Sequence, residues 1–112
     1  MAAKFEIKKA KNGQFMFSLK ASNGEIILTS EMYKIKSSCK KGIKSVRDNA
    51  RDSEHFKTLI AKNGESYFVL RAGNYQVIGK SEMYSSTSSL ENGIRSVKQN
   101  APSAMVVDLT KA

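Results

Sequence analysis

The sequence predicts an α+β protein in which a unit of three strands and one helix occurs twice and is followed by a closing strand. Ser-Glu-Met-Tyr at residues 30–33 and Gly-Ile-Lys-Ser-Val at residues 42–46 return 51 residues later, the second as Gly-Ile-Arg-Ser-Val, without insertion or deletion. In each copy, alternating apolar side chains give way to an apolar stripe of helical spacing. We expect one domain over residues 1–112, with repeat 1 at residues 4–54 and repeat 2 at residues 55–112.

The first copy opens with three short strands. Phe5 and Ile7 alternate with polar residues, and Phe15, Phe17 and Leu19 share one face of the next strand. Asn-Gly pairs separate the strands and predict type I′ hairpin turns, in which both central residues have positive φ. Such short turns require antiparallel neighbours. The strands are expected at residues 5–8, 14–21 and 25–29.

A helix follows these strands, because apolar residues recur at the spacing of one helical face. We expect Ser37 or Ser38 to cap its N-terminus. Gly42, and Gly93 in the second copy, lie in mid-helix, where glycine costs about 1 kcal/mol relative to alanine. We expect these glycines to allow close approach of a side chain from the sheet. The apolar stripe consists of Cys39, Ile43, Val46 and Ala50.

The second copy repeats this pattern. Gly73 and Asn74 stand in its second turn, where both residue types tolerate positive φ. Ser88 and Glu91 have the spacing of a capping box, and Pro102 is expected to end the helix. Its strands are expected at residues 55–61, 66–72 and 76–80, and its helical stripe consists of Leu90, Ile94, Val97 and Ala101.

A seventh strand is expected at residues 105–109, which align with the first strand of each copy so that Val107 corresponds to Phe5. One helix on three strands is a marginal core. We therefore expect a single, mainly antiparallel sheet with both helices packed on one face, in a strand order that stays open. The covered face is expected to consist of Phe5, Ile7, Phe15, Phe17, Leu19, Phe56, Phe68 and Leu70.

The paired Asn-Gly turns, the Ser-Glu-Met-Tyr segments and the Gly-Ile-Lys/Arg-Ser-Val helix cores resemble the YegP-like family of small bacterial proteins, in its duplicated form. The resemblance covers nearly the whole chain. It implies tandem β3-α-β units in one sheet, with the terminal strands exchanged between the repeats. The family has no known function, so the resemblance implies no reaction, ligand or catalytic residue. This chain has Met32 and Met83 before the tyrosines, where many relatives are expected to have a small residue such as glycine.

The composition excludes several classes of protein. One cysteine rules out an internal disulfide framework, and no apolar run approaches the roughly 18 residues of a transmembrane helix. The first residues lack the apolar core of a signal peptide. We therefore expect a soluble, cytoplasmic protein without membrane association. A monomer is expected, because the duplication supplies both halves of the sheet.

Groups suited to catalysis or metal binding are scarce. Cys39 lies on the apolar stripe where the second copy has Leu90, so a packing role is expected, and His55 aligns with Lys4 at the start of a strand. No histidine and cysteine pair has metal-ligand spacing, and no glycine-rich phosphate motif occurs. We expect no enzyme activity, no metal and no cofactor.

Glu31 and Tyr33, with Glu82 and Tyr84, are the most distinctive polar residues. They could form two equivalent halves of a small site near the helix N-termini. We favour a structural role, in which tyrosine covers the corner between strand and helix. The glutamate then binds the backbone donors exposed there, where the helix dipole favours negative charge.

The sheet face without helices is the candidate contact surface. By alternation it carries Lys8, Met16, Ser18, Lys20 and Thr29 from repeat 1, and Lys57, Leu59, Tyr67, Val69, Arg71 and Lys80 from repeat 2. Such a face could bind nucleic acid, form a dimer or partner interface, or simply be solvent-exposed. The net charge of +9 attracts anionic partners, and it also serves solubility.

We expect a non-enzymatic binding or scaffold module of unassigned role, with nucleic-acid binding as the alternative. The candidate contacts for nucleic acid or another anionic partner are Lys20, Tyr67, Arg71 and Lys80 on the helix-free face, and Lys40, Lys41, Lys44 and Arg47 on the first helix, where they are expected to face water.

Overall fold

The computed structural model describes residues 3–110, so the two residues at each end of the domain expected over 1–112 lie outside the described residues. Its strands are β1 (Lys4–Lys9), β2 (Phe15–Lys20), β3 (Ile26–Thr29), β4 (Phe56–Ile60), β5 (Ser66–Arg71), β6 (Val77–Lys80) and β7 (Met105–Asp108). Its helices are α1 (Lys36–Asn49) and α2 (Thr87–Asn100), and a 3-10 turn, η1 (Ser53–His55), precedes β4.

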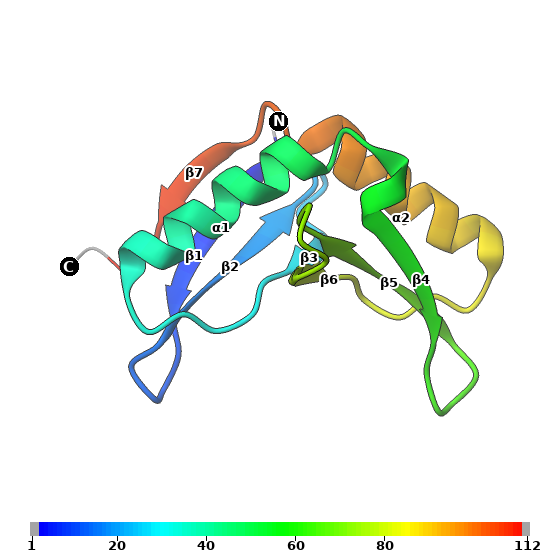
Figure 1. Cartoon of the computed structure of the whole chain (residues 1–112), viewed down its shortest axis with the longest axis horizontal. Helices are drawn as coiled ribbons and strands as arrows, with labels where there is room; N and C mark the ends of the chain where they lie inside the picture. The colour runs from blue at the N-terminus through cyan, green and yellow to red at the C-terminus, as the bar shows by residue number, and fades with distance from the viewer. Residues whose placement is uncertain (1–2, 111–112) are drawn as a thin grey trace.

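The strands form one mixed sheet in the order β4-β5-β6-β3-β2-β1-β7 (Figure 1). All neighbouring strands are antiparallel except β1 and β7, which are parallel. The two repeats meet at β3 and β6, where Thr29 lies opposite Lys80, its counterpart 51 residues later. The prediction of an α+β fold with a single, mainly antiparallel sheet is confirmed.

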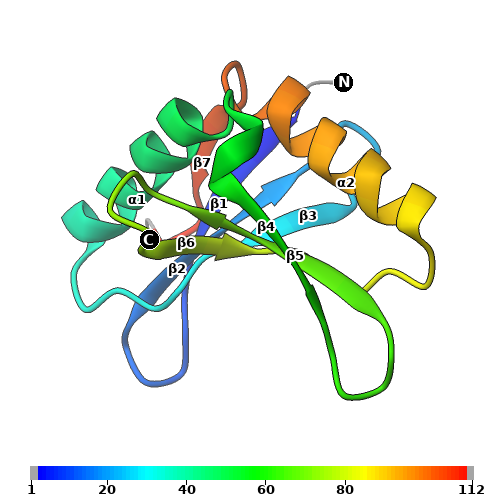
Figure 2. The ribbon, with the colours of Figure 1, turned by 45° about the vertical axis from the view of Figure 1, so that its right-hand side comes forward.

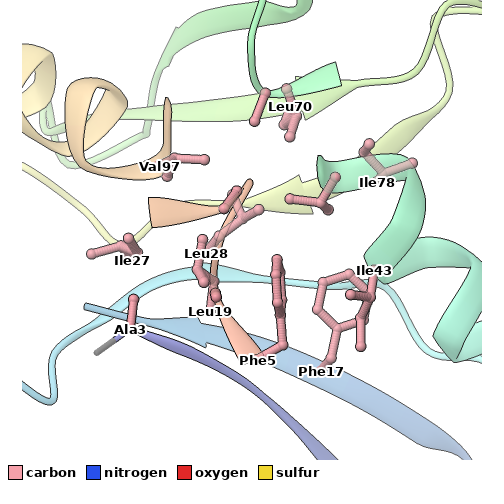
Figure 3. Packing of buried hydrophobic residues seen from close by; sticks show 14 of the residues in the cluster. Ala3, Phe5, Phe17, Leu19, Ile27, Leu28, Ile43, Leu70, Ile78 and Val97 are labelled. Carbon is pink, nitrogen blue, oxygen red and sulfur yellow. The ribbon is translucent and has the colours of Figure 1, made fainter. Parts of the chain in front are cut away.

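Both helices lie on the same side of the sheet, and the hairpins β1–β2 and β4–β5 diverge away from them (Figure 2). Each helix packs against both repeats: α1 contacts β2 and β6, and α2 contacts β5 and β3. In Figure 3, Ile78 of β6 accordingly lies toward Ile43 of α1, and Ile27 of β3 toward Val97 of α2. The two halves therefore share one core. Its largest fully buried side chains include Phe5, Phe17, Phe68, Ile7, Leu19, Leu28 and Leu70.

Two members of the predicted covered face, Phe15 and Phe56, are only half-buried. The predicted helix caps also differ from the structure. Ser37 and Ser38 lie inside α1, whose N-cap position is Ile35 without a side-chain cap. The predicted capping box is wrong as well, because α2 begins at Thr87 and is capped by Ser86, whose hydroxyl accepts a hydrogen bond from Ser89 N at 3.2 Å. Each helix begins earlier than predicted.

The hairpin turns are three-residue loops and not type I′ turns. In the first, Gly13 N donates to Ala10 O at 3.0 Å, and Asn12 Oδ1 accepts from Gln14 N at 3.0 Å. Only the third loop residue has positive φ, as in a type I turn followed by a left-handed residue. The asparagine therefore serves through its side chain, and the glycine supplies the conformation.

The second turn of repeat 2 places this left-handed position on Tyr75 and not on Gly73 or Asn74, as predicted. Tyr75 has a φ of 68°, at the position that Gly24 holds in repeat 1 with a φ of 86°. Gly73 lies two residues before this position, so it cannot take the left-handed conformation in place of Tyr75. A bulky residue in this conformation is strained, by roughly 1–2 kcal/mol.

β7 adds to the outer edge of β1 and does not repeat its position. Phe5 lies opposite Val106, and Ile7 opposite Asp108. Asp108 faces the helix layer, since its carboxylate contacts Lys36 of α1 at 2.9 Å. Val106 therefore shares that side, and Val107 points to the other side. The predicted equivalence of Val107 with Phe5 is wrong, because Phe5 faces the helix layer, whereas Val107 points to the other side of the sheet.

Candidate partner-binding surface

The helix-free face of β5 and its neighbours carries two cations, each against a tyrosine ring. Lys80 Nζ lies 4.9 Å from the centre of the Tyr67 ring, and Arg71 Cζ lies 5.1 Å from the centre of the Tyr75 ring. Tyr75 is 74% exposed. Cation–π contacts of this kind hold charge and ring side by side at the surface. The structure thus pairs the predicted contact residues Tyr67 and Lys80 with each other, and it pairs Arg71 with Tyr75, a residue that the prediction did not include.

On the repeat 1 half of this face, a carboxylate neutralises the lysines. Glu6 Oε1 lies 2.9 Å from Lys20 Nζ, and Glu6 Oε2 lies 3.3 Å from Lys4 Nζ. Lys8 is 4.0 Å away. The Lys20 ammonium holds the pKa of Glu6 below its usual value, although burial of the carboxyl opposes this shift. Lys20, a predicted contact residue, therefore already has an anionic partner.

Repeat 2 reverses the charge at the position of this carboxylate. Lys57 stands 51 residues after Glu6 and is exposed. Arg71, the counterpart of Lys20, has a buried Nε that makes no hydrogen bond within residues 3–110. The repeat 2 half of the face therefore presents cations without the internal acid found in repeat 1. We call Lys57, Tyr67, Arg71, Tyr75 and Lys80 the repeat 2 patch.

Two residues expected to be exposed on the helix-free face are buried. Ser18 is 2% exposed and Val69 is 7% exposed. The long side chains that lie across this face, such as Lys20 on Glu6 and Lys80 over Tyr67, account for their burial. The apolar content of the accessible face is thus lower than the sequence predicted.

The basic residues of α1 do not join this patch, because α1 packs on the other side of the sheet (Figure 2). Lys40, Lys41 and Lys44 are exposed there, as predicted. Arg47 does not face water: its guanidinium lies 5.5 Å from the Phe5 ring and donates to the carbonyl of Ala104. The predicted contact residues therefore do not form a single site.

A shallow hollow of about 290 Å³ adjoins the patch at the start of β4. It is lined by Glu54, His55, Arg71, Ala72, Gly73 and Tyr75. The Nδ1 atom of His55 lies 2.9 Å from the carbonyl oxygen of Arg71, and its Nε2 atom lies 3.9 Å from the Asp52 carboxylate. The expected surface position of His55 is thus only partly correct, because the half-buried ring links Asp52, at the start of η1, to Arg71 at the end of β5.

The tyrosines of the Ser-Glu-Met-Tyr segments belong to the core. Tyr33 stacks on Phe17 with ring centres 6.4 Å apart and an interplanar angle of 13°, and its hydroxyl occupies the space that a side chain at Gly42 would need. Tyr84 stands in the same relation to Phe68 and Gly93. Burial raises the pKa of both tyrosines. The structural interpretation of the tyrosines and of the mid-helix glycines is therefore correct.

The glutamates of these segments behave differently from the prediction. Glu31 and Glu82 are exposed, and neither carboxylate hydrogen-bonds a backbone donor within the described part of the chain. They line a hollow of about 430 Å³ where β3 meets β6, together with Thr29, Ser30, Lys80, Ser81 and Met83. The two segments thus lie beside each other where β3 meets β6, but their tyrosines do not line this hollow and pack in the core instead.

Cys39 is fully buried, and burial raises the pKa of its thiol to about 11. A thiol of this kind is a poor nucleophile at neutral pH. Its packing role is as predicted. Among residues 3–110, no group of three or more histidine, cysteine, aspartate or glutamate side chains is arranged to hold a metal ion. No helix in that range is both long and apolar enough to span a bilayer.

Two members of the repeat 2 patch escaped the sequence-based prediction of contact residues. Tyr75 could have been found by aligning it with Gly24, since a tyrosine there must adopt the left-handed conformation of its counterpart. The importance of Lys57 could have been found by aligning it with Glu6. Both signals lie in the differences between the copies, whereas the prediction of the fold used their similarities.

The family model described as "Domain of unknown function (DUF1508)" matches the chain twice, at residues 10–56 and 61–108. The UPF0339 protein YegP of Escherichia coli is 51% identical over 98% of this chain and 100% of its own length. A UPF0339 protein of Acinetobacter baylyi is 53% identical over 98% and 99%.

The solution structure of yegP from E. coli, a protein of unknown function, matches with a TM-score of 0.93 at 50% identity and covers 100% of this chain and 97% of that one. The solution structure of a UPF0339 protein from Shewanella oneidensis matches with a TM-score of 0.91 at 47% identity, over 97% and 92%. With the two-fold match of the family model and these full-length relatives, the chain belongs to the DUF1508 family of YegP-like proteins, which has no known function.

Proposed function

We propose that this protein is a non-enzymatic binding module that contacts an anionic partner through the repeat 2 patch. The observation that carries the proposal is the charge reversal between Glu6 and Lys57. In repeat 1 the Glu6 carboxylate neutralises Lys20. In repeat 2 a lysine replaces that carboxylate, and Arg71, the counterpart of Lys20, makes no ion pair within residues 3–110.

The chemistry of the other polar groups supports a binding role over a catalytic one. The thiol of Cys39 is buried in the core, and the ring of His55 is engaged through Nδ1 by the carbonyl of Arg71. A nucleophile needs an activating base within hydrogen-bond reach, and neither residue is placed to form such a pair with the other.

Single-stranded nucleic acid is the partner class that the tyrosines favour. Tyr67 and Tyr75 each present a ring beside a cation, with Lys80 and Arg71 within about 5 Å of the ring centres. Proteins that bind single strands use this combination, since bases stack on aromatic rings while lysine or arginine binds phosphate.

The decisive experiment measures binding of a fluorescent single-stranded RNA of mixed sequence over a series of salt concentrations. We expect affinity at physiological salt that falls as salt rises, because phosphate contacts release counterions. Lys57→Glu restores to repeat 2 the carboxylate of repeat 1, and it is expected to weaken binding about tenfold. Lys57 is exposed, so the variant should fold normally.

Lys41→Glu is the matched control, because it makes the same charge change on the exposed face of α1, in the other layer. It should retain most of the affinity. Equal losses in both variants would contradict a local site, and would show attraction by net charge alone. Absence of binding at physiological salt would reject nucleic acid as the partner.

We infer that β7 is a terminal strand that repeat 2 contributes to repeat 1. This is the expected exchange of terminal strands, in one direction only. The pairing of β7 with the outer edge of β1 supports this interpretation. The domain boundaries at residues 4–54 and 55–112, the monomeric state and the cytoplasmic location stay predictions. Sedimentation of the purified protein tests the monomer.

A further inference from the structure

β7 gives repeat 1 an outer neighbour that repeat 2 lacks. β7 runs parallel to β1, with Ile7 opposite Asp108. The carbonyl of Ile7 accepts a hydrogen bond from Leu109 N at 3.0 Å, and Lys36 of α1 contacts the Asp108 carboxylate at 2.9 Å. β4, the counterpart of β1, forms the opposite edge of the sheet. Within residues 3–110 no strand pairs with its outer side (Figure 1).

The missing neighbour leaves apolar surface open along β4 and α2. Three side chains of repeat 1 that are at most 2% exposed have counterparts in repeat 2 that are half-buried or exposed. These pairs are Phe5 and Phe56, Ile7 and Thr58, and Ile43 and Ile94. The strand residues among them face the helix layer in both repeats, so the open strip lies between β4 and α2.

A hollow of about 410 Å³ lies along α2, lined by Glu91, Ile94, Arg95, Lys98 and Gln99. On α1, Lys36 contacts Asp108 of β7, and Arg47 contacts Ala104, the residue directly before β7. Lys98 is the counterpart of Arg47, and its Nζ donates to Ser53 Oγ at 2.6 Å, directly before β4. The hollow is therefore on the side of α2 where β7 would lie if repeat 2 had one.

The exposed edge of β4 has the properties of a pairing surface. Because Ile7 presents its backbone to β7, its counterpart Thr58 presents its N–H and C=O groups outward. Ile60 is 76% exposed on this strand, where repeat 1 has Lys9. Natural edge strands carry charges that prevent unwanted pairing, and an apolar side chain has the opposite effect.

We propose that the outer edge of β4 binds an extended segment of another protein, which runs parallel to β4 and packs beside α2 as β7 packs beside α1. β7 indicates the chemistry of this segment: small or apolar residues face the helix layer, as Ala104 and Val106 do. Thr87 stands where α1 has Lys36, so the segment has no cation to pair with at the position of Asp108.

A second copy of this chain is a poor occupant. Its β7 is already paired with its own β1, and on the helix side Lys36 binds Asp108 and Arg47 binds Ala104, directly before the strand. Transfer of that strand to β4 of another copy would open an equal edge at β1, with no gain in paired backbone. A segment from a different protein adds pairing without this loss.

The test uses the whole protein and a synthetic peptide with the sequence of residues 103–110, in which Asp108 is replaced by threonine. Amide hydrogen exchange is followed by NMR. At saturating peptide, exchange at the amide of Thr58 is expected to slow about tenfold, since the outward N–H gains an acceptor. Thr58→Pro removes this N–H and should abolish peptide binding, because the peptide loses its donor on β4. The hydrogen bonds between β4 and β5 do not use this N–H, so the variant should keep them.

Thr58→Val is the matched control: it keeps the N–H, adds apolar surface, and should bind the peptide at least as well as the natural protein. Unchanged unfolding temperatures show that both variants fold. The proposal is overturned if the peptide instead protects amides of β1 by displacing the natural tail, or if Thr58→Pro binds equally well. It is also overturned if millimolar peptide protects nothing, or if Thr58 is protected through self-association without peptide.

Discussion

Tyr33 and Gly42 show how single residues position a helix on this sheet. The tyrosine ring stacks on Phe17, and its hydroxyl lies beneath the helix where a side chain at Gly42 would otherwise project. Tyr84, Phe68 and Gly93 repeat the arrangement. A glycine in mid-helix is unfavourable by about 1 kcal/mol, and the close approach of helix and sheet offsets this cost.

Gly42→Ala is expected to destabilise the protein by about 1–3 kcal/mol despite its better helix propensity, because the added methyl group overlaps the Tyr33 hydroxyl. Tyr33→Phe in the same chain removes that oxygen and should restore part of the loss. Denaturant unfolding of the two single variants and the double variant measures the coupling. Additive effects would contradict the contact.

Tyr75 is the residue at which the repeats differ most in backbone strain. Its left-handed conformation has a cost of about 1–2 kcal/mol, which Gly24 avoids at the same position of repeat 1. The strained ring is exposed and lies against Arg71. Strain of this kind is often kept where a side chain serves binding, which agrees with its place in the repeat 2 patch.

Among the elements, β7 is the outer neighbour that β1 has and that β4, its counterpart in repeat 2, lacks within residues 3–110. It covers the outer edge of β1, where Phe5 and Ile7 are fully buried. β4 shows the state without such a strand, since Phe56 is half-buried and Thr58 is exposed. The same structure thus contains both the covered and the uncovered version of one edge.

Deletion of residues 104–112 is therefore expected to lower the free energy of unfolding by about 2 kcal/mol or more. The reason is partial exposure of Phe5 and Ile7, each worth roughly 1 kcal/mol when half of its burial is lost. The loss of a partner for Arg47 adds to this. Thermal unfolding measures the effect, and a cooperative transition at the unchanged temperature would contradict it.

The elements also show what the sequence could predict. The 51-residue offset and the apolar periodicity were sufficient for all strands and both helices, because local propensity and burial agree in them. The strand order was not accessible, since it depends on Thr29 meeting Lys80 across the two repeats. The helical pattern alone places Arg47 in solvent, because its partner, the carbonyl of Ala104, lies 57 residues away and is a backbone group that no side-chain pattern reveals.

For the molecule as a whole, duplication gives a symmetric scaffold, and substitution makes its two ends different. Repeat 1 has a neutralised face and a covered edge, through Glu6 and β7. Repeat 2 has an open cationic face at Lys57 and an open edge at Thr58. Features that the scaffold needs, such as the stacked tyrosines, are the same in both halves. Both proposed binding surfaces consequently lie in repeat 2.

The stability of the whole fold should depend on pH through two carboxylates, the buried Glu6 and the half-buried Asp108. Hydrogen bonds from Thr110 and the ammonium of Lys36 hold the pKa of Asp108 well below its usual value. Lys20 lowers the pKa of Glu6. A carboxylate with a depressed folded-state pKa stabilises the fold above its unfolded pKa of about 4, and this contribution is lost as the pH falls toward the folded-state pKa.

The urea midpoint is accordingly expected to be constant from about pH 7 to pH 5 and to fall steeply below about pH 4. Asp108→Asn should lower the midpoint at neutral pH and flatten the fall, because it removes the group that must be protonated. Asp48→Asn, at an exposed carboxylate 3.6 Å from Lys44 on α1, is the control and should keep the full fall. An equally steep fall in Asp108→Asn would show that the contact between Lys36 and Asp108 does not link β7 to α1 in solution.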